Sequence, residues 1–280
     1  MKYDYLIVGA GFFGSTFARL ATDDGKTCLV LDSRPHIGGN SYSKKIEGID
    51  VHAYGPHIFH TNDDDIWNFI NRFTKFNNFR LCPKLQSDGK LYSLPFNMNT
   101  FYELWGCTKP EEAKAIIESQ RLKLDRPAAN LEEQALSMIG KDLYELIVKD
   151  YTTKQWKRDP KDLPASIIKR LPIRFTFDNN YFNDKYQGIP VDGYDKMFES
   201  MLDDIDVIVD ENYFDNKDHW DSMADKVVFT GKIDEYFNYE FGELEYRTLD
   251  FQHELLDTDN YQGVAMVNFP ILDVPWTRIV

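Results

Sequence analysis

The hydrophobic pattern at the start of the chain predicts a β–α–β unit. Apolar runs at Tyr3 to Val8 and Cys28 to Leu31 have strand character, and Ser15 to Thr22 has helical spacing. Between the first strand and the helix stands Gly9-Ala10-Gly11-Phe12-Phe13-Gly14, a G-x-G-x-x-G sequence, and Asp32 follows the second strand. This order of strand, glycine turn, helix, strand and acid is what a dinucleotide-binding fold requires.

Each part of this unit has a physical role in holding a dinucleotide. Gly9 permits a tight turn, Gly11 lets the backbone approach a pyrophosphate, and Gly14 lets helix and strand pack closely. The helix N-terminus presents free N–H groups and a positive dipole end to the phosphates. Asp32 lies about 20 residues on, where it can accept hydrogen bonds from ribose hydroxyls. A glycine-rich turn in an ordinary α/β domain is the alternative interpretation.

A second glycine pair favours FAD over NAD. Gly38 and Gly39 follow Asp32 in the string DSRPHIGGN, and they let a loop pass close to the pyrophosphate. Arg34 and Asn40 can meet its oxygens there. This D-x5-G-G arrangement resembles the FAD-binding segment of glutathione-reductase-like flavoproteins, and NAD domains usually lack it. We therefore expect FAD as the cofactor.

The pattern further along predicts a helical insert and then strands. Helical spacing covers Ile66 to Phe73 and much of Thr100 to Lys157, where Pro110 and Asn130 mark helix starts. Arg170 to Tyr186 is aromatic and β-branched, which predicts extended strands or a mobile loop. Later elements are a helix at Tyr194 to Leu202, strands at Val207 to Val209 and Lys226 to Gly231, and an antiparallel sheet from segments such as Leu244 to Phe251 and Val264 to Phe269.

These elements predict an α/β fold, in which a Rossmann-like FAD-binding domain carries an inserted helical domain and an antiparallel β-sheet domain. Since a strand ending in Thr-Gly returns to the cofactor in FAD domains of this type, we expect the FAD domain to be discontinuous. The predicted ranges are 1–78 and 191–238 for the FAD-binding domain, 79–168 for a helical substrate domain, 169–190 for a mobile loop and sheet, and 239–280 for a shortened antiparallel sheet.

Composition narrows the class of protein. The 280 residues are 42% hydrophobic and 28% charged, as in soluble globular proteins, and no window of 18 apolar residues predicts a membrane span. The net charge of −14 disfavours nucleic acid and anionic membranes as partners. Cys28, Cys82 and Cys107 lack a C-x-x-C spacing, which favours a reducing cytoplasm over a disulfide framework.

A phosphate ligand in so acidic a chain needs cations placed against the repulsive background. Arg170, Arg174 and Arg278 are the best candidates for diphosphate binding, because guanidinium donors match phosphate oxygens. For any one of them, a solvated surface ion pair is the alternative.

Two further segments carry candidate chemistry. His52, His57 and His60 favour placement beside a cofactor ring over histidines satisfied in the core or loop. A His-x-x-His metal site is the least favoured, because without a helix the spacing fixes no common face, and we expect no metal. Tyr151 to Trp156 predicts either core packing or a nucleoside-binding patch in which an aromatic face stacks on a base or sugar.

Several strings together resemble UDP-galactopyranose mutase of the bacterial type, in order over essentially all of the chain. They are GAGFFG, DSRPHIGGNSY, YGPHIFHTND, SLPFNMNTFYELWG, NLEEQALSMIGKDLYELIVKDYTTKQW, DLPASIIKRLPIRFTFDNNYFNDKYQGIP, VVFTGKIDEYF and VPWTRIV.

The resemblance implies an isomerase that interconverts UDP-galactopyranose and UDP-galactofuranose with reduced FAD. In this family the flavin N5 attacks the anomeric carbon as UDP leaves, the adduct opens as an iminium, the ring recloses as furanose, and UDP returns. The resemblance further implies a homodimer, a reductant for the flavin, and a product that supplies galactofuranose for surface polysaccharides.

The resemblance also assigns residues, position by position. The FAD-contacting positions are Phe13, Asp32, Ser33, Asn40, His57 and Ile58, beside the turn glycines Gly9, Gly11, Gly14 and Gly39. The UDP-sugar contacts are Thr152, Trp156, Tyr181, Asn268 and Arg278, together with Arg170, the mobile-loop arginine that closes on the diphosphate and excludes water. The expected catalytic residues are His60, near the flavin, Arg170 and Arg278.

The chain departs from the family pattern in two places. Family members continue well beyond Val280, so we expect a C-terminally truncated form without the tyrosines that grip the diphosphate or a late flavin-contacting Gly-Arg segment. Leu81-Cys82 stand where relatives often carry polar residues, which predicts a local change in uridine-side contacts.

Two other functions remain as alternatives. One is an FAD-dependent oxidoreductase of the amine-oxidase type, and the other is an inactive truncated remnant. The ordered arginines and the YTTKQW segment favour the mutase over the oxidoreductase.

Overall fold

A computed structural model of the chain describes residues 2–168 and 173–280. The chain divides into a first unit, Met1–Phe79 with Asp184–His253, and a second unit, Arg80–Asn183 with Glu254–Val280. None of the helices formed by the described residues has the length and apolar character needed to cross a membrane.

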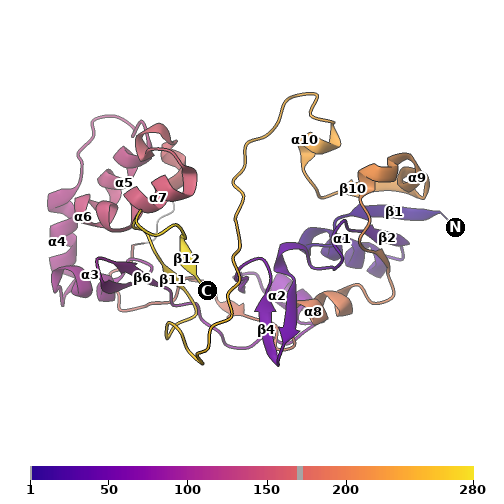
Figure 1. The fold of residues 1–280 in the computed structure, drawn as a ribbon, viewed down its shortest axis with the longest axis horizontal. Coiled ribbons are helices and arrows are strands. Elements are labelled where there is room, and N and C mark those ends of the chain that lie inside the picture. The colour runs from indigo at the N-terminus through magenta and orange to yellow at the C-terminus, as the bar shows by residue number, and fades with distance from the viewer. Residues whose placement is uncertain (1, 169–172) are drawn as a thin grey trace. The chain divides into compact units, whose positions relative to one another are not determined.

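The first unit is built on a four-stranded parallel sheet (Figure 1). Its order is β10 (Ala224–Phe229), β1 (Tyr3–Val8), β2 (Cys28–Leu31) and β9 (Asp206–Ile208), with α1 (Phe12–Asp23) between β1 and β2. The β–α–β unit and both later strands predicted from the sequence are therefore confirmed.

Both faces of this sheet are covered, which explains why its central strands read as apolar runs rather than alternating ones. On one face Leu6 and Leu31 pack with Trp220 of α9 (Lys217–Ser222). On the other face Ile7 packs with Ala18 of α1.

Outside this sheet, the described residues of the first unit form two antiparallel strand pairs and three further α-helices. The strands β3 (Ser43–Ile46) and β4 (Ile49–His52) pair with each other, and β5 (Phe59–Thr61) pairs antiparallel with β8 (Tyr186–Gly188). The helices are α2 (Asp64–Ile70), α8 (Tyr194–Met201) and α10 (Ile233–Tyr236), of which the first two confirm predicted helices.

Helices dominate the second unit, as predicted for this part of the chain. They are α3 (Met98–Trp105), α4 (Pro110–Gln120), α5 (Leu131–Ile139), α6 (Lys141–Leu143), a π-helical turn at Tyr144–Val148, and α7 (Lys149–Trp156). The predicted cap of α5 is confirmed, since the Asn130 side chain accepts the Glu133 N–H and Gly140, at φ +77°, ends the helix.

A small sheet completes the second unit. Its order is β12 (Arg278–Ile279), β11 (Val267–Asn268), β6 (Lys84–Ser87) and β7 (Lys90–Ser93). The pair of β11 and β12 is antiparallel, as predicted for this end of the chain. The antiparallel pair of β6 and β7 was not predicted, because it lies in the range expected to be helical, and β11 and β6 run parallel, so the sheet is mixed.

The predicted strand at Leu244 to Phe251 is wrong. This segment carries no strand, and Leu244 and Leu249 are 59% and 62% exposed. Alternation of apolar and polar residues gives a segment a face that can lie on a sheet, but a strand also needs a hydrogen-bonding neighbour, and no described residue pairs with this segment. The described part of the predicted strand-or-loop segment, from Ile173 to Lys185, contains no strand. Its one β-bridge to another described residue joins Ile173 to Phe96.

Two positions of the glycine turn admit only glycine. Gly9 has φ +111°, and a Cβ there would collide with the Thr230 side chain. A Cβ on Gly14 would collide with the Gly9 carbonyl oxygen, because α1 packs directly against the end of β1. At Gly11 a Cβ would meet only the Gly39 Cα, at an ordinary 3.8 Å.

We therefore expect Gly14→Ala to lower the free energy of unfolding by about 2 to 3 kcal/mol, since backbone must move to admit the methyl group. The matched variant Gly11→Ala should change it by less than about 1 kcal/mol. Urea denaturation of both variants measures the difference. Equal stability of the two would contradict the close packing at Gly14.

Candidate functional site

The carboxyl edge of the parallel sheet carries the glycine turn and Asp32, which are among the predicted cofactor residues of the first unit. The Gly9 N–H donates to Leu31 O at 2.7 Å, and the Thr230 N–H donates to Val8 O at 2.9 Å. Asp32 starts at the same edge, where its N–H donates to Ile208 O at 3.0 Å. Ligands of open parallel sheets bind at this edge, outside the ends of the strands.

The two glycine loops meet there and form a backbone cradle. The Gly38 N–H donates to Ala10 O at 2.8 Å, and a Cβ on Gly39 would lie only 3.0 Å from the Gly11 Cα. Gly11 is the N-cap of helix α1 and offers no side-chain cap, so the first-turn N–H groups of the helix have no side-chain acceptor. A side chain at either glycine would fill the space that a pyrophosphate needs.

Asp32 holds the first glycine loop in place. Its Oδ2 accepts the Ala10 N–H at 2.7 Å and its Oδ1 accepts the Arg34 N–H at 2.9 Å. The residue is only 9% exposed. Each carboxylate oxygen can accept a second hydrogen bond. The expected bond from a ribose hydroxyl to Asp32 stays a prediction, and so does the cofactor contact of Ser33, which is exposed.

Arg34 supplies an unused donor beside the cradle. Its Nη2 donates to Asn40 Oδ1 at 2.9 Å, and its guanidinium lies 4.5 Å from the centre of the Tyr54 ring. Its Nη1 is buried and has no hydrogen-bond partner among the described residues. Buried donors normally have partners, so this atom marks a place for an anionic or carbonyl group. The cradle and this donor together fit a dinucleotide.

The histidine loop lies between β4 and β5. The His57 N–H donates to His52 Nδ1 at 3.1 Å, and the Tyr194 hydroxyl donates to His57 O at 3.0 Å. Burial, and secondarily the neighbouring His57, lowers the pKa of His52 below its usual 6.5. A neutral His52 therefore holds the backbone that carries His57 and Ile58.

His60 is tied to a residue that the sequence analysis missed. Its Nδ1 lies 2.6 Å from Asp184 Oδ2, and the Asn62 amide donates to the other oxygen of Asp184. The Lys185 N–H in turn donates to Asn62 Oδ1 at 2.9 Å. Asp184 thus orients the His60 ring. No local pattern could reveal this bond, because 124 residues separate its two partners. Among the described residues no cluster of histidine, cysteine and acidic side chains suits a metal ion.

The second unit brings two of the predicted substrate residues together. Asn268 and Arg278 stand directly opposite each other in the antiparallel pair of β11 and β12, so their side chains share a face of the sheet. The Arg278 Nη2 donates to the Tyr151 hydroxyl on α7 at 2.7 Å. Helix α7 also carries Thr152 and Trp156, the former buried and the latter half-buried.

Lys154, also on α7, was missed as well. Its Nζ donates to the carbonyl oxygens of Phe269, Val274 and Trp276 at 2.7, 3.0 and 2.9 Å. It is 7% exposed, and burial lowers its pKa from the usual 10.5.

Arg174 and Tyr181 form a separate cluster. The Arg174 guanidinium donates to Asn180 O and, at 3.0 Å, to Tyr181 O, so it closes a turn, while its Nε is buried and has no partner among the described residues. These two bonds favour a structural role for Arg174 over diphosphate binding. The Tyr181 N–H donates to Leu81 O at 2.8 Å, and its side chain is exposed. Arg170 lies outside the described residues.

Comparison with known proteins gives these sites a context. A family profile described as UDP-galactopyranose mutase matches residues 146–280, and one described as NAD(P)-binding Rossmann-like domain matches residues 7–73. A dTDP-fucopyranose mutase of Escherichia coli is 40% identical over 98% of this chain and 75% of its own length. A probable UDP-galactopyranose mutase of Klebsiella pneumoniae is 42% identical over 98% of this chain and 72% of its own length.

The chain belongs to the UDP-galactopyranose mutase family. The crystal structure of a reduced UDP-galactopyranose mutase matches 99% of this chain and 69% of that one with a TM-score of 0.67. At 14% identity this likeness shows the fold alone. The resemblance inferred from the sequence motifs and the predicted fold class are both confirmed.

Family membership does not by itself test the role of each residue. Phe13 lies on the first turn of α1, next to the backbone cradle, and its side chain is largely exposed. The roles carried over to Phe13, Ile58, Thr152, Trp156 and Tyr181 stay predictions.

The lowered pKa of His52 predicts an acid-sensitive first unit. As the pH falls below about 6.5, the unfolded chain binds the proton before the folded one does. The free energy of unfolding should therefore decrease as the pH falls toward the lowered pKa. His52→Gln, whose amide oxygen can still accept the His57 N–H, should remove this component.

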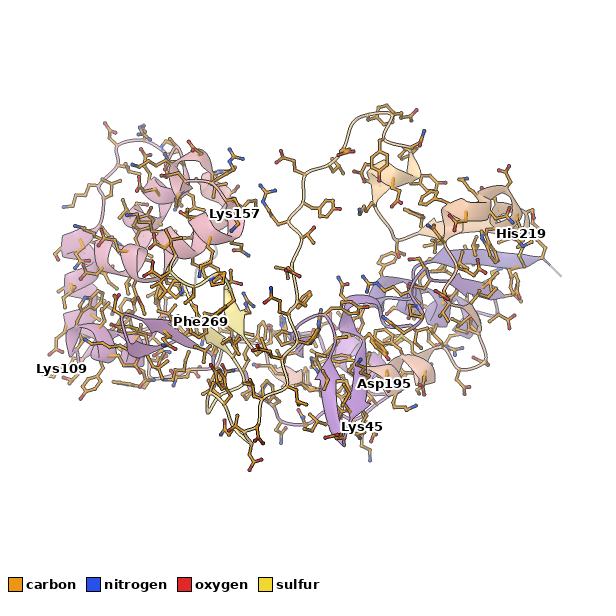
Figure 2. All side chains as sticks on the ribbon, in the orientation of Figure 1. Lys45, Lys109, Lys157, Asp195, His219 and Phe269 are labelled. Atoms are coloured by element: carbon orange, nitrogen blue, oxygen red, sulfur yellow. The ribbon has the colours of Figure 1, made fainter. Side chains whose placement is uncertain are left out.

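Denaturant unfolding at about pH 5 and about pH 7.5 measures the effect. The control is His219→Gln, at an exposed histidine labelled in Figure 2, which should keep the wild-type difference between the two pH values. An unchanged difference in His52→Gln would show that another group titrates.

Proposed function

We propose that the chain interconverts UDP-galactopyranose and UDP-galactofuranose with the help of reduced FAD. The observation that carries the proposal is the match over 98% of the chain to relatives named as sugar-nucleotide mutases. Two features of the chain support it: a backbone cradle suited to a dinucleotide, and an arginine set opposite Asn268 and beside Tyr151.

The first unit would hold the FAD. Gly11 and Gly39 would bring their backbones close to the pyrophosphate, and the buried Nη1 of Arg34 would donate to one of its oxygens or to the adjoining ribose. His57 would lie near the flavin on a loop fixed by His52 and Tyr194. Bound and reduced, the flavin supplies the nucleophilic chemistry that isomerisation of the sugar needs.

The second unit would hold the diphosphate of the nucleotide sugar. Arg278 donates from Nη2 to the Tyr151 hydroxyl, and its Nη1 lies 4.0 Å from Met266 Sδ, so the orientation of the guanidinium is fixed. A guanidinium has five N–H donors, so several remain for phosphate oxygens. A fixed, permanently charged fork can attract a diphosphate locally even though the whole chain carries a net charge of −14.

His60 would act from the first unit. The Asp184 carboxylate accepts from Nδ1, which fixes the ring and leaves Nε2 as the nitrogen directed away from Asp184. We propose that this fixed ring lies near the flavin and helps to set its electrostatic environment.

A second substrate is supported by one observation. The relative named dTDP-fucopyranose mutase is 40% identical over 98% of this chain, close to the 42% of the relative named for UDP-galactopyranose. Of the Leu81-Cys82 pair at the expected uridine side, Leu81 is buried and Cys82 is exposed, so Cys82 is the side chain that a thymine methyl group would meet there.

The substrate can be assigned by comparing the two sugar nucleotides in separate reactions. Dithionite-reduced, FAD-loaded protein is incubated with UDP-galactofuranose or dTDP-fucofuranose, and the pyranose products are separated by chromatography. We expect the UDP-sugar to turn over with the higher kcat/KM. A higher kcat/KM for the dTDP-sugar would make the second substrate the physiological class, and peroxide release from amines without sugar isomerisation would support the oxidoreductase alternative.

Arg278→Ala should cost about 2–4 kcal/mol of transition-state stabilisation, a loss of roughly 30- to 900-fold in kcat/KM. The reason is that the substitution leaves a desolvated diphosphate without its guanidinium partner. The matched control Arg158→Ala removes an arginine of the same unit whose guanidinium donates to Asp162 O, and it should keep the wild-type kcat/KM. Equal rates in both variants would remove Arg278 from the diphosphate site.

The homodimer, the cytoplasmic location and the use of galactofuranose in surface polysaccharide stay predictions.

A further inference from the structure

A nine-residue loop from Phe269 to Thr277 joins β11 to β12 and therefore sets the positions of Asn268 and Arg278. Its ends are joined by the Phe269 N–H, which donates to Thr277 O at 2.9 Å. The rings of Phe269 and Trp276 meet edge to face with their centres 6.1 Å apart. These contacts close the loop but do not attach it to α7.

The attachment comes from Lys154. Three carbonyl groups of the loop converge on its ammonium, at 2.7 to 3.0 Å, and an ammonium has three N–H donors. All of its donors are therefore used by one loop. Figure 2 labels Phe269 on this loop and Lys157 at the end of α7.

Without the cation, three carbonyl dipoles would point at one another in a place closed to water. Lys154 is 7% exposed, and carbonyl groups left unpaired in such a place are costly. The loop would have to open to bring them to water. Since Asn268 precedes the loop and Arg278 follows it, such an opening would change the pairing of these two residues.

We propose that Lys154 is a positioning residue, whose ammonium organises the Phe269–Thr277 loop and thereby holds Arg278 against Tyr151 and opposite Asn268. Lys154 itself need not touch a substrate, because all three of its donors are bound to the loop. Only the nucleotide-binding part of the inference rests on the proposed function.

The first test needs no ligand. Lys154→Met keeps the aliphatic stem and removes the ammonium, and Lys157→Met removes an exposed charge three residues further along. Hydrogen exchange measured by mass spectrometry on peptides covering 267–279 should be faster on the order of tenfold or more in Lys154→Met and unchanged in Lys157→Met. Unchanged exchange in Lys154→Met would overturn the proposal.

The second test asks whether Lys154 acts through Arg278. UDP affinity, measured by isothermal titration calorimetry, should fall on the order of tenfold in Lys154→Met and stay at the wild-type value in Lys157→Met. Lys154→Met combined with Arg278→Ala should bind UDP as weakly as Arg278→Ala alone, because the loss is shared. Independent, additive losses would overturn the positioning role even if the loop exchanges faster.

Misfolding of the variant and failure of the proposed function can each be told apart from failure of the positioning role. If Lys154→Met does not fold, Lys154→Gln retains two donors and should give an intermediate exchange rate; wild-type exchange in it would overturn the proposal. If the wild-type chain does not bind UDP, the proposed function fails, and the exchange experiment alone decides whether Lys154 organises the loop.

Discussion

The hydrogen bond from the Ala10 N–H to the Asp32 carboxylate is the interaction on which the first unit depends. It joins the turn after β1 to the end of β2, and the same carboxylate accepts the Arg34 N–H. The glycine loop, the start of α1 and the segment that leads to Gly39 are thereby fixed to one buried group. A dinucleotide site built of backbone needs such an anchor, because glycines contribute no side chains that could hold the loop in shape.

In the second unit a buried cation, the Lys154 ammonium, holds a backbone segment in place. Four of the unit's predicted substrate residues come from two distant segments, α7 and the β11–β12 pair. One bond from Arg278 to the Tyr151 hydroxyl and three bonds from Lys154 to the loop carbonyls connect these segments. A π-helical turn precedes α7, and such turns shift the side chains that follow around the helix axis. The direction in which α7 presents Thr152 and Trp156 therefore depends on this irregular turn.

The parts of the fold that the sequence could predict are those with local signals. Asn130 and Gly140 bound α5 because capping depends on residues three or four positions apart. The glycine turn is recognisable because strand, turn and helix are contiguous. By contrast, the bonds of Lys154 span 115 to 122 residues, and that of His60 to Asp184 spans 124. The alternation at Leu244 to Phe251 failed as a strand signal for the same reason, since pairing depends on a partner elsewhere in the chain.

A comparison of Arg174 with Arg278 shows why residue type alone does not define a phosphate site. Arg174 and Arg278 are equally charged, yet Arg174 gives two of its donors to backbone carbonyls of its own turn and is largely buried, while Arg278 gives one to a tyrosine hydroxyl and stays exposed. A donor already paired with a carbonyl must break that bond to meet a phosphate, so it contributes little net free energy. In a chain of charge −14, attraction of a diphosphate depends on the few cations whose donors remain available and whose orientation is already fixed. Arg278 meets both conditions, and it does so only while its loop keeps it beside α7.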